Sequence, residues 1–277
     1  MSDTGKCQVE DIELALLLEA LYQHSGNDFR GYEAAALKGK LTAFLKQKGF
    51  CTISLLQNRV LRDKATSDAL VRVLHERAVA MFEDIEYQHA LRTTIIKNLH
   101  SWPDPNVWIP ECKNAEEVFG LAIWLEEEGL SDKARIFVTC PHSDLLVEAM
   151  RGEFSSDRLP QYEEHYRLSG GKRSLSSYGH HDQSKFVFSP SLSRNIIWSQ
   201  SDIASDASFN EFQFVSGRTA MTEFGEGMRR RSLQVFDESL SSFGILSVDP
   251  LDQPNLYFAN RRYKPIEATL GLYRRIA

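Results

Sequence analysis

The sequence lacks any apolar run close to the about 20 residues that a membrane-spanning helix requires. Residues 1–6 have neither a basic start followed by an apolar stretch nor a small-residue cleavage pattern, so they do not match an export signal. The 277 residues are 42% hydrophobic and 25% charged, which is typical of a globular chain long enough for a small and a larger domain. We therefore expect a cytoplasmic protein with no membrane span.

Cysteine is scarce and scattered. Cys7, Cys51, Cys112 and Cys140 are far apart and form no Cys-x-x-Cys pair, so neither a disulfide framework nor a structural zinc site is indicated. Cys112 and Cys140 each follow a predicted strand, with His142 nearby, which leaves a thiol pair or an adventitious metal site as an alternative. Free thiols are the main expectation.

Positive charge is in the minority, with 32 Lys and Arg against 38 Asp and Glu and a formal net charge of −6. This balance gives no general attraction to phosphate backbones, and we do not expect nucleic acid as a partner. Basic clusters at residues 229–231, 261–262 and 274–275 are typical of solvated surface, with a binding role as the alternative.

Familiar catalytic and metal-binding arrangements are missing as well. No serine stands in a Gly-x-Ser-x-Gly elbow, so a hydrolase nucleophile is not indicated. His180, His181 and Asp182 are ligand types in a predicted polar loop, but adjacent residues rarely converge on one ion without a third ligand elsewhere. We predict no metal site.

Strand signals are almost absent from the first hundred residues, where apolar side chains recur at helical spacing. Turn residues at 25–28 and 48–50 separate short helices, and Ser67 or Asp68 is expected to cap the helix that carries Leu70 and Leu74. Two prolines at 103 and 105 then stop the last helix. This predicts a helical domain with a linker helix over residues 1–100 and a second domain over residues 101–277.

In the second domain, short apolar runs typical of buried strands alternate with amphipathic helices, which predicts an α/β fold with a mainly parallel sheet. The predicted strands lie at residues 107–109, 135–139, 195–198, 211–215 and 245–248, and the predicted helices at 115–128, 144–151 and 228–240. Two further strand-like runs, at 256–259 and 270–273, have no clear helix between them and favour an antiparallel hairpin at the sheet edge.

Glycine is missing from the turn after the first predicted strand, where residues 111–115 are Glu-Cys-Lys-Asn-Ala. Ligands of open parallel sheets bind beyond the C-terminal ends of the strands, where glycines let the backbone approach a cofactor closely. Glu111 and Lys113 instead place long charged side chains there, and Ala115 carries a Cβ. Cys140 follows the second strand, where a nucleoside site usually offers a carboxylate to both ribose hydroxyls.

Several stretches between residues 82 and 244 together resemble one family. They are Phe82-Glu83-Asp84, Glu116-Glu117 before an apolar helix, residues 166–178, residues 205–212 and residues 238–244. The chain resembles the chemotaxis-receptor methyltransferases of the CheR type, which transfer a methyl group from S-adenosylmethionine to receptor glutamates. The resemblance implies a Rossmann-like, mainly parallel seven-stranded methyltransferase sheet behind the N-terminal helical bundle.

Departures from the family pattern fall on the cofactor side. Glu83 stands where the family has an arginine that meets the carboxylate of S-adenosylmethionine, and Cys140 replaces its ribose-binding aspartate. Asp202-Ile203 replaces an Asn-Leu pair, only Arg218 remains of a Cys-Arg-Asn element, and Glu223 replaces a tyrosine beside the transferred methyl group. The resemblance thus implies these vestigial pocket positions: Glu83, Glu111, Cys112, Ala115, Glu116, Cys140, Asp202, Arg218 and Glu223.

Each lost charge-assisted contact costs about 1.5 to 3 kcal/mol, and three such losses would erase a micromolar affinity of about 8 kcal/mol. We therefore expect no bound cofactor and no catalytic residue. Glu116 and Glu117 are better explained by the helix dipole than as remnants of a ligand site. Lys38 and Lys40 stand where the family has an arginine pair for acidic receptor helices, so charge persists there without the forked donors.

The leading hypothesis is a non-catalytic, protein-binding component of bacterial signalling, in motility, chemotaxis-like or biofilm control. The expected partner is a receptor, a response regulator or a related methyltransferase. One alternative is an active S-adenosylmethionine-dependent protein-glutamate methyltransferase with a rearranged pocket. Another is a sensor that binds a different small ligand in the old pocket, as Lys113, Arg218 and residues 229–231 suggest.

Overall fold

The computed structural model of the chain describes residues 3–77, 79–203, 211–254, 258 and 262–276. The chain forms two compact units, Met1–Glu76 with Glu223–Arg229, and Arg77–Thr222 with Arg230–Ala277. Within the described ranges, no helix combines the length and the hydropathy needed to cross a membrane. Each unit is described below by itself.

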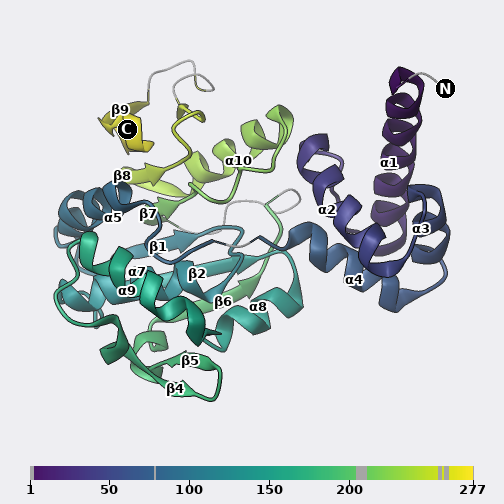
Figure 1. Ribbon diagram of the computed structural model, residues 1–277. Helices are drawn as coiled ribbons and strands as arrows, with labels where there is room; N and C mark the ends of the chain where they lie inside the picture. Colours follow the sequence, from purple (N-terminus) through teal and green to yellow (C-terminus); the bar gives the residue numbers. More distant parts are fainter. Residues whose placement is uncertain (1–2, 78, 204–210, 255–257, 259–261, 277) are drawn as a thin grey trace. The chain divides into compact units, whose positions relative to one another are not determined.

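The N-terminal region is helical, as predicted. It contains α1 (Asp3–Ser25), α2 (Ala34–Lys48), α3 (Ile53–Val60) and α4 (Lys64–His75) (Figure 1). The helices bury leucines at helical spacing, among them Leu14, Leu17, Leu18 and Leu21 of α1.

Two ends in this unit have clear local causes, and one predicted cap is wrong. Gly49 ends α2 in the left-handed conformation at φ 76°, which glycine adopts without steric cost. Thr52 caps α3, since its side chain accepts a hydrogen bond from the Leu55 N–H at 3.2 Å. The prediction that Ser67 or Asp68 caps the fourth helix is wrong, because α4 begins at Lys64 after Asp63 and Ser67 is buried.

The second unit is built on a seven-stranded sheet with the order β6-β2-β1-β7-β8-β10-β9 (Figure 1). The strands are β6 (Ile196–Gln200), β2 (Arg135–Cys140), β1 (Asn106–Ile109), β7 (Phe212–Ser216), β8 (Leu240–Ser247), β10 (Leu272–Arg275) and β9 (Tyr263–Glu267). The pairs from β6 to β8 are parallel, and β10 is antiparallel to both β8 and β9. The predicted parallel sheet with an antiparallel end is confirmed.

The predicted strand at residues 256–259 falls almost wholly outside the described residues, and Phe258, its one described member, is not in a strand. The antiparallel partner of β10 is β9, which the sequence prediction missed. The other predicted strands and helices of this unit are present, with ends shifted by a few residues.

Helices and short turns surround the sheet. They are α5 (Ile85–Ala90), the π-helical segment η1 (Leu91–Ile96), α6 (Lys97–Leu99), α7 (Ala115–Glu127), α8 (Ser143–Met150), α9 (Leu159–Leu168) and α10 (Glu226–Ser239), whose first turn belongs to the other unit. The 3-10 segments are η2 (Ser156–Arg158), η3 (Leu175–Tyr178), η4 (Pro190–Ser193) and η5 (Ala268–Leu270). Helix α7 is buried almost throughout, which explains its nearly continuous apolar sequence.

A second, three-stranded sheet was not predicted. It has the order β3-β5-β4, with β3 (Glu153–Ser155), β5 (Lys185–Phe188) and β4 (Gly179–Asp182), and lies beyond α9 (Figure 1). His180, His181 and Asp182 are therefore exposed residues of an antiparallel strand, and the predicted polar loop at these positions is wrong. The stretch 166–178 begins inside α9 and ends in η3.

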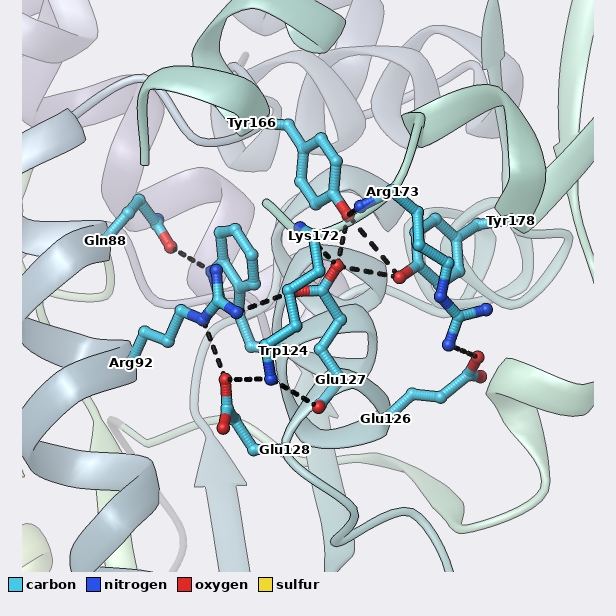
Figure 2. Close-up of polar contacts among 10 residues, drawn as sticks. All are labelled: Gln88, Arg92, Trp124, Glu126, Glu127, Glu128, Tyr166, Lys172, Arg173 and Tyr178. Carbon is cyan, nitrogen blue, oxygen red and sulfur yellow. Dashed lines mark hydrogen bonds and ion pairs between the residues drawn. The ribbon is translucent and has the colours of Figure 1, made fainter. Parts of the chain in front are cut away.

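The stretch 166–178 is fastened to the end of α7 by the carboxylate of Glu127 (Figure 2). This side chain is 0% exposed and pairs with Arg92 at 3.0 Å. Its Oε1 accepts hydrogen bonds from the hydroxyl of Tyr178 at 2.9 Å, from the backbone N–H of Lys172 at 3.0 Å and from the hydroxyl of Tyr166. One buried carboxylate thus joins η1, α7, α9 and the turn that follows α9.

Candidate functional site

The turn between β1 and α7 occupies the edge of the sheet where a cofactor would approach. Its backbone bends at Glu111, a residue other than glycine with φ 53°, a conformation that costs energy for residues with a Cβ. The Cys112 N–H donates to the Thr139 carbonyl at 2.8 Å. Asn114 caps α7 by accepting from the Glu117 N–H at 3.4 Å, while its side-chain amide donates to the Val79 carbonyl at 2.7 Å. Hydrogen bonds to β2, to Val79 and to the start of α7 thus fix the turn.

The two long charged side chains of this turn point inward and pair with each other. Lys113 Nζ lies 3.2 Å from Glu111 Oε2, and the two side chains are 3% and 1% exposed. The other oxygen of Glu111 accepts from the Ile203 N–H at 3.3 Å. Burial raises the pKa of Glu111, Lys113 opposes that rise, and nearby Asp202 adds to it. Side chains fill the space beside the turn where glycine would leave room.

Cys140 ends β2 as a buried thiol. Its Sγ donates to the His142 carbonyl at 3.4 Å, and burial raises its pKa to about 11. Cys112 donates to the Asn114 carbonyl at 3.3 Å, and burial raises its pKa well above the ordinary value. With exposed Cys51 these are free thiols, as predicted, whereas the side chain of Cys7 lies outside the described part. No group of three or more His, Cys, Asp or Glu side chains in the described ranges is placed to hold a metal ion.

A cavity of about 590 Å³ lies near the turn, since Ile109 before the turn and Glu116 and Glu117 after it are among the lining residues. Its walls come from the stretch between Arg77 and Leu91, from the first half of α7, and from the end of β7 with the residues after it. The polar side chains on these walls are Arg77, Glu83, Asp84, Glu86, Gln88, Glu116, Glu117, Ser216, Arg218 and Thr219. A volume of this size is in the range of small-molecule sites.

Both arginines of the cavity wall are engaged within the protein. Arg218 pairs with Asp84, donates to the Leu270 carbonyl at 3.1 Å and lies 4.4 Å from the centre of the Tyr87 ring. Arg77 donates to the Thr219 carbonyl at 2.6 Å. An anion that binds either guanidinium would therefore have to compete with these contacts.

The two glutamates of the first turn of α7 have different surroundings. Glu116 reaches towards α9, where it lies 3.3 Å from both Arg158 and the hydroxyl of Tyr162. Glu117 accepts from the Thr219 hydroxyl at 2.7 Å, and burial raises its pKa. Besides lying in the first turn of α7, where the helix dipole favours acids, both glutamates form specific side-chain contacts.

The other positions implied by the resemblance are dispersed. Glu83 is exposed at the cavity wall, and Ala115 is the buried first residue of α7. Glu223 belongs to the helical unit, where its carboxylate lies 2.7 Å from Lys40 Nζ. Lys40 also donates to the Leu74 carbonyl at 2.8 Å.

The structure therefore brings Glu111, Cys112, Lys113, Cys140 and Asp202 close enough to interact at the turn. A second group, Glu83, Glu116 and Arg218, lines the cavity. Sequence reasoning missed Arg77, Asp84, Tyr87 and Thr219 as members of that wall. Asp84 and Thr219 carried a signal, because they stand in the stretches Phe82-Glu83-Asp84 and Gly217-Arg218-Thr219 that the resemblance singles out.

Comparisons with known proteins agree on one family. The profile of the CheR methyltransferase all-alpha domain matches residues 12–75. A Pseudomonas putida protein named as methyltransferase Cher3 is 33% identical over 265 residues, which cover 96% of this chain and 97% of that protein. A chemotaxis protein methyltransferase of Listeria innocua is 21% identical over 230 residues, covering 82% of this chain and 85% of that protein.

Similarity to solved structures is weaker. The glycopeptide N-methyltransferase MtfA, solved with sinefungin, shares 13% identity with a TM-score of 0.35, covering 62% of this chain and 54% of that one.

Proposed function

The chain belongs to the CheR methyltransferase family, and we propose that it is a member that does not bind S-adenosylmethionine and serves bacterial signalling by binding another protein. The buried Glu111–Lys113 pair carries this proposal. It occupies the turn against which the nucleoside half of the cofactor would lie. The signalling process we propose is motility, chemotaxis-like or biofilm control, by analogy with the chemotaxis methyltransferases among the relatives.

The residues around the turn do not fit an adenosyl group. A ligand entering there would have to separate Glu111 from Lys113, and breaking a buried pair costs about 3 to 5 kcal/mol. Cys140 offers a protonated thiol that is already donating to the His142 carbonyl, so it gives no acceptor for ribose hydroxyls. Micromolar binding amounts to about 8 kcal/mol, of which these two losses remove a large part.

Isothermal titration calorimetry of the whole protein with S-adenosylmethionine and S-adenosylhomocysteine tests this proposal. We expect no binding at micromolar concentrations. The variant Glu111→Gly/Lys113→Gly/Cys140→Asp removes the pair and supplies a carboxylate, and we expect measurable affinity from it. Micromolar affinity of the unmodified chain would contradict the proposal.

Exposed apolar side chains on the helical unit support a protein-binding role. Ile12 and Leu16 of α1 are 55% and 53% exposed, and Leu55 of α3 is 52% exposed. Gln57 of α3 donates to the Leu16 carbonyl at 3.4 Å, so these helices are adjacent at this point. Apolar residues at positions i and i+4 of one helix suit the docking of a partner helix.

The lysines of α2 favour such an apolar contact over an ionic one. Lys38 pairs with Asp11, and Lys40 pairs with Glu223, so their charges are partly neutralised inside the unit. Affinity purification from the native host with the variant Ile12→Glu/Leu16→Glu tests the surface. We expect partners to be lost with this variant and retained with Val147→Glu/Met150→Glu, which places the same two charges at apolar side chains of α8 that are 51% and 49% exposed.

An active protein-glutamate methyltransferase with a rearranged pocket is the second candidate. The cavity of about 590 Å³ beside Arg218 favours it, as does the methyltransferase name of the relatives. A methyl-transfer assay with purified receptor fragments separates the two candidates, since the first predicts no transfer.

A further inference from the structure

The wall of the 590 Å³ cavity carries an excess of negative charge. Its carboxylates are Glu83, Asp84, Glu86, Glu116 and Glu117, and its cations are Arg77 and Arg218, so five acidic side chains face two basic ones. A concave site lined mainly by one sign of charge concentrates ligands of the opposite sign. Two of these carboxylates are paired within the protein, Asp84 with Arg218 and Glu116 with Arg158. Glu83, Glu86 and Glu117 remain against Arg77, and this balance favours a cation over an anion.

The contacts within the wall strengthen this preference. Arg218 is paired with Asp84 and stacked near Tyr87, and Arg77 donates to the Thr219 carbonyl. Both positive groups are therefore largely used by the protein itself. An incoming anion would have to compete with these contacts while lying near the exposed carboxylates of Glu83 and Glu86.

One carboxylate on the wall is incompletely satisfied. Glu117 Oε1 accepts from the Thr219 hydroxyl, whereas Oε2 has almost no exposed area and accepts no hydrogen bond from any described residue. A buried acceptor without a donor is unfavourable, and a ligand N–H would satisfy it. The terminal torsion of a glutamate is broad, so a rotation can bring the carboxylate towards the cavity, with a change in its contact to the Thr219 hydroxyl.

Two further carboxylates stand at the outer part of the wall. Glu83 and Glu86 are exposed, and neither forms an ion pair with a described residue. The wall also contains the buried apolar side chains of Phe82, Ile109 and Leu121. It therefore combines a buried acceptor on Glu117, apolar surface, and the exposed carboxylates of Glu83 and Glu86.

We propose that the cavity binds a small aliphatic amine, with one ammonium group on Glu117 and the alkyl chain along Phe82 and Leu121. A second ammonium group of a diamine would lie near Glu83 and Glu86. Ammonium donors form charge-assisted hydrogen bonds with carboxylates, and methylene groups gain from leaving water. The inference rests on the proposed function, because the amine can bind only if S-adenosylmethionine does not take up the cavity.

Calorimetric titration with four-carbon probes tests the inference on the whole protein in about 0.15 M salt, which screens contacts between exposed charges. The probes are 1,4-diaminobutane, neutral 1,4-butanediol and succinate. We expect the diamine to bind with a Kd of about 1 mM or tighter, and the diol and the dicarboxylate to bind at least about tenfold more weakly. Equal binding of all three probes, or none of the diamine, would overturn the inference.

Charge-removing variants locate the site. Glu117→Gln keeps an oxygen for Thr219 and should weaken diamine binding by about tenfold or more, the range for a lost charge-assisted hydrogen bond. Glu126→Gln removes the same charge from the other end of α7, outside the cavity wall, and should leave the affinity unchanged. Equal affinity of Glu117→Gln and the unmodified chain would overturn the assignment. If Glu117→Gln fails to fold, the exposed Glu83→Gln/Glu86→Gln variant takes its place, with a weakening of severalfold expected.

Titration with S-adenosylmethionine in parallel separates this inference from the proposed function. Diamine binding without S-adenosylmethionine binding supports both. Binding of neither ligand contradicts the inference and leaves the proposed function standing. Tight binding of S-adenosylmethionine contradicts the proposed function, whether or not the diamine binds.

Discussion

Replacing Glu127 by alanine should destabilise the α/β unit far more than replacing its neighbour Glu126. The Glu127 carboxylate is 0% exposed and pairs with Arg92 at 3.0 Å. It also accepts from the hydroxyls of Tyr166 and Tyr178 and from the backbone N–H of Lys172 (Figure 2). The substitution removes the common acceptor of all these donors.

The cost follows from what remains. Arg92 keeps its second ion pair, with Glu128 at 2.9 Å, so its charge is not left wholly unpaired. The hydroxyls of buried Tyr166 and Tyr178 lose an acceptor that water cannot freely replace, whereas the N–H of Lys172 lies at an exposed position. Removing one partner of a buried charged pair costs about 3 to 5 kcal/mol, and we expect Glu127→Ala to fall in this range.

Glu126→Ala is the matched control. Its partner Arg173 lies 3.5 Å away, and the two side chains are 27% and 52% exposed. Such a pair contributes about 1 kcal/mol or less. Glu127→Gln, which keeps an oxygen acceptor but loses the charge, should fall between the two alanine variants.

Urea unfolding followed by tryptophan fluorescence measures the difference. All 4 tryptophans of the sequence lie in the α/β unit, so the signal reports on that unit alone. With a denaturant slope of about 3 kcal/mol per M, the midpoint of Glu127→Ala should fall by roughly 1 M or more. A difference below about 1 kcal/mol between the two alanine variants would refute the reasoning, because it would mean that the buried contacts contribute no more than an exposed pair.

Two further predictions concern titrating groups. Iodoacetamide at pH 8 should label exposed Cys51 rapidly and Cys140 slowly, since Cys140 is buried with a pKa of about 11. Peptide mass spectrometry measures both labelling rates, and equal rates would contradict the burial of Cys140. Burial, followed by hydrogen bonds with Tyr166 and Glu127, raises the pKa of Tyr178 above its unfolded value of about 10. The resulting stability is present below about pH 10 and is lost as the pH rises above it, so the unfolding free energy should fall between pH 9 and 11.5, less steeply for Tyr178→Phe.

The sheet was predictable because its central strands are buried on both faces. A strand such as β1 is then a continuous apolar run, as in Val107-Trp108-Ile109, and no alternation is needed to identify it. Strand β9 was missed because it contains Pro265, which lowers strand propensity and is tolerated only because β9 is the edge of the sheet. Strand β4 was missed because its sequence, Gly-His-His-Asp, is polar and exposed.

The unusual turn was visible in the sequence because the absence of glycine after a predicted strand can be seen from the residue types alone. The pairing of Glu111 with Lys113 was not, since two residues at positions i and i+2 can point to any of several partners. The position of Glu223 depends on contacts between distant segments. Glu33 donates its N–H to the Glu223 carbonyl at 2.8 Å, and the Gly225 N–H donates to the Gly31 carbonyl at 2.8 Å, which tie this segment to the helical unit.

The turn and the cavity of the candidate site differ in whether their charged side chains are paired within the protein. On the turn side, Lys113 neutralises Glu111, whose other oxygen accepts from the Ile203 N–H. A buried ion pair gives little net stability compared with apolar residues of similar size, so folding alone is a weak reason for this pair. On the cavity side, Arg218 is neutralised by Asp84, while Glu117 keeps an oxygen with no donor among the described residues. The buried Glu111–Lys113 pair and the unmet acceptor of Glu117 together are our reason for proposing a change of ligand over a simple loss of one.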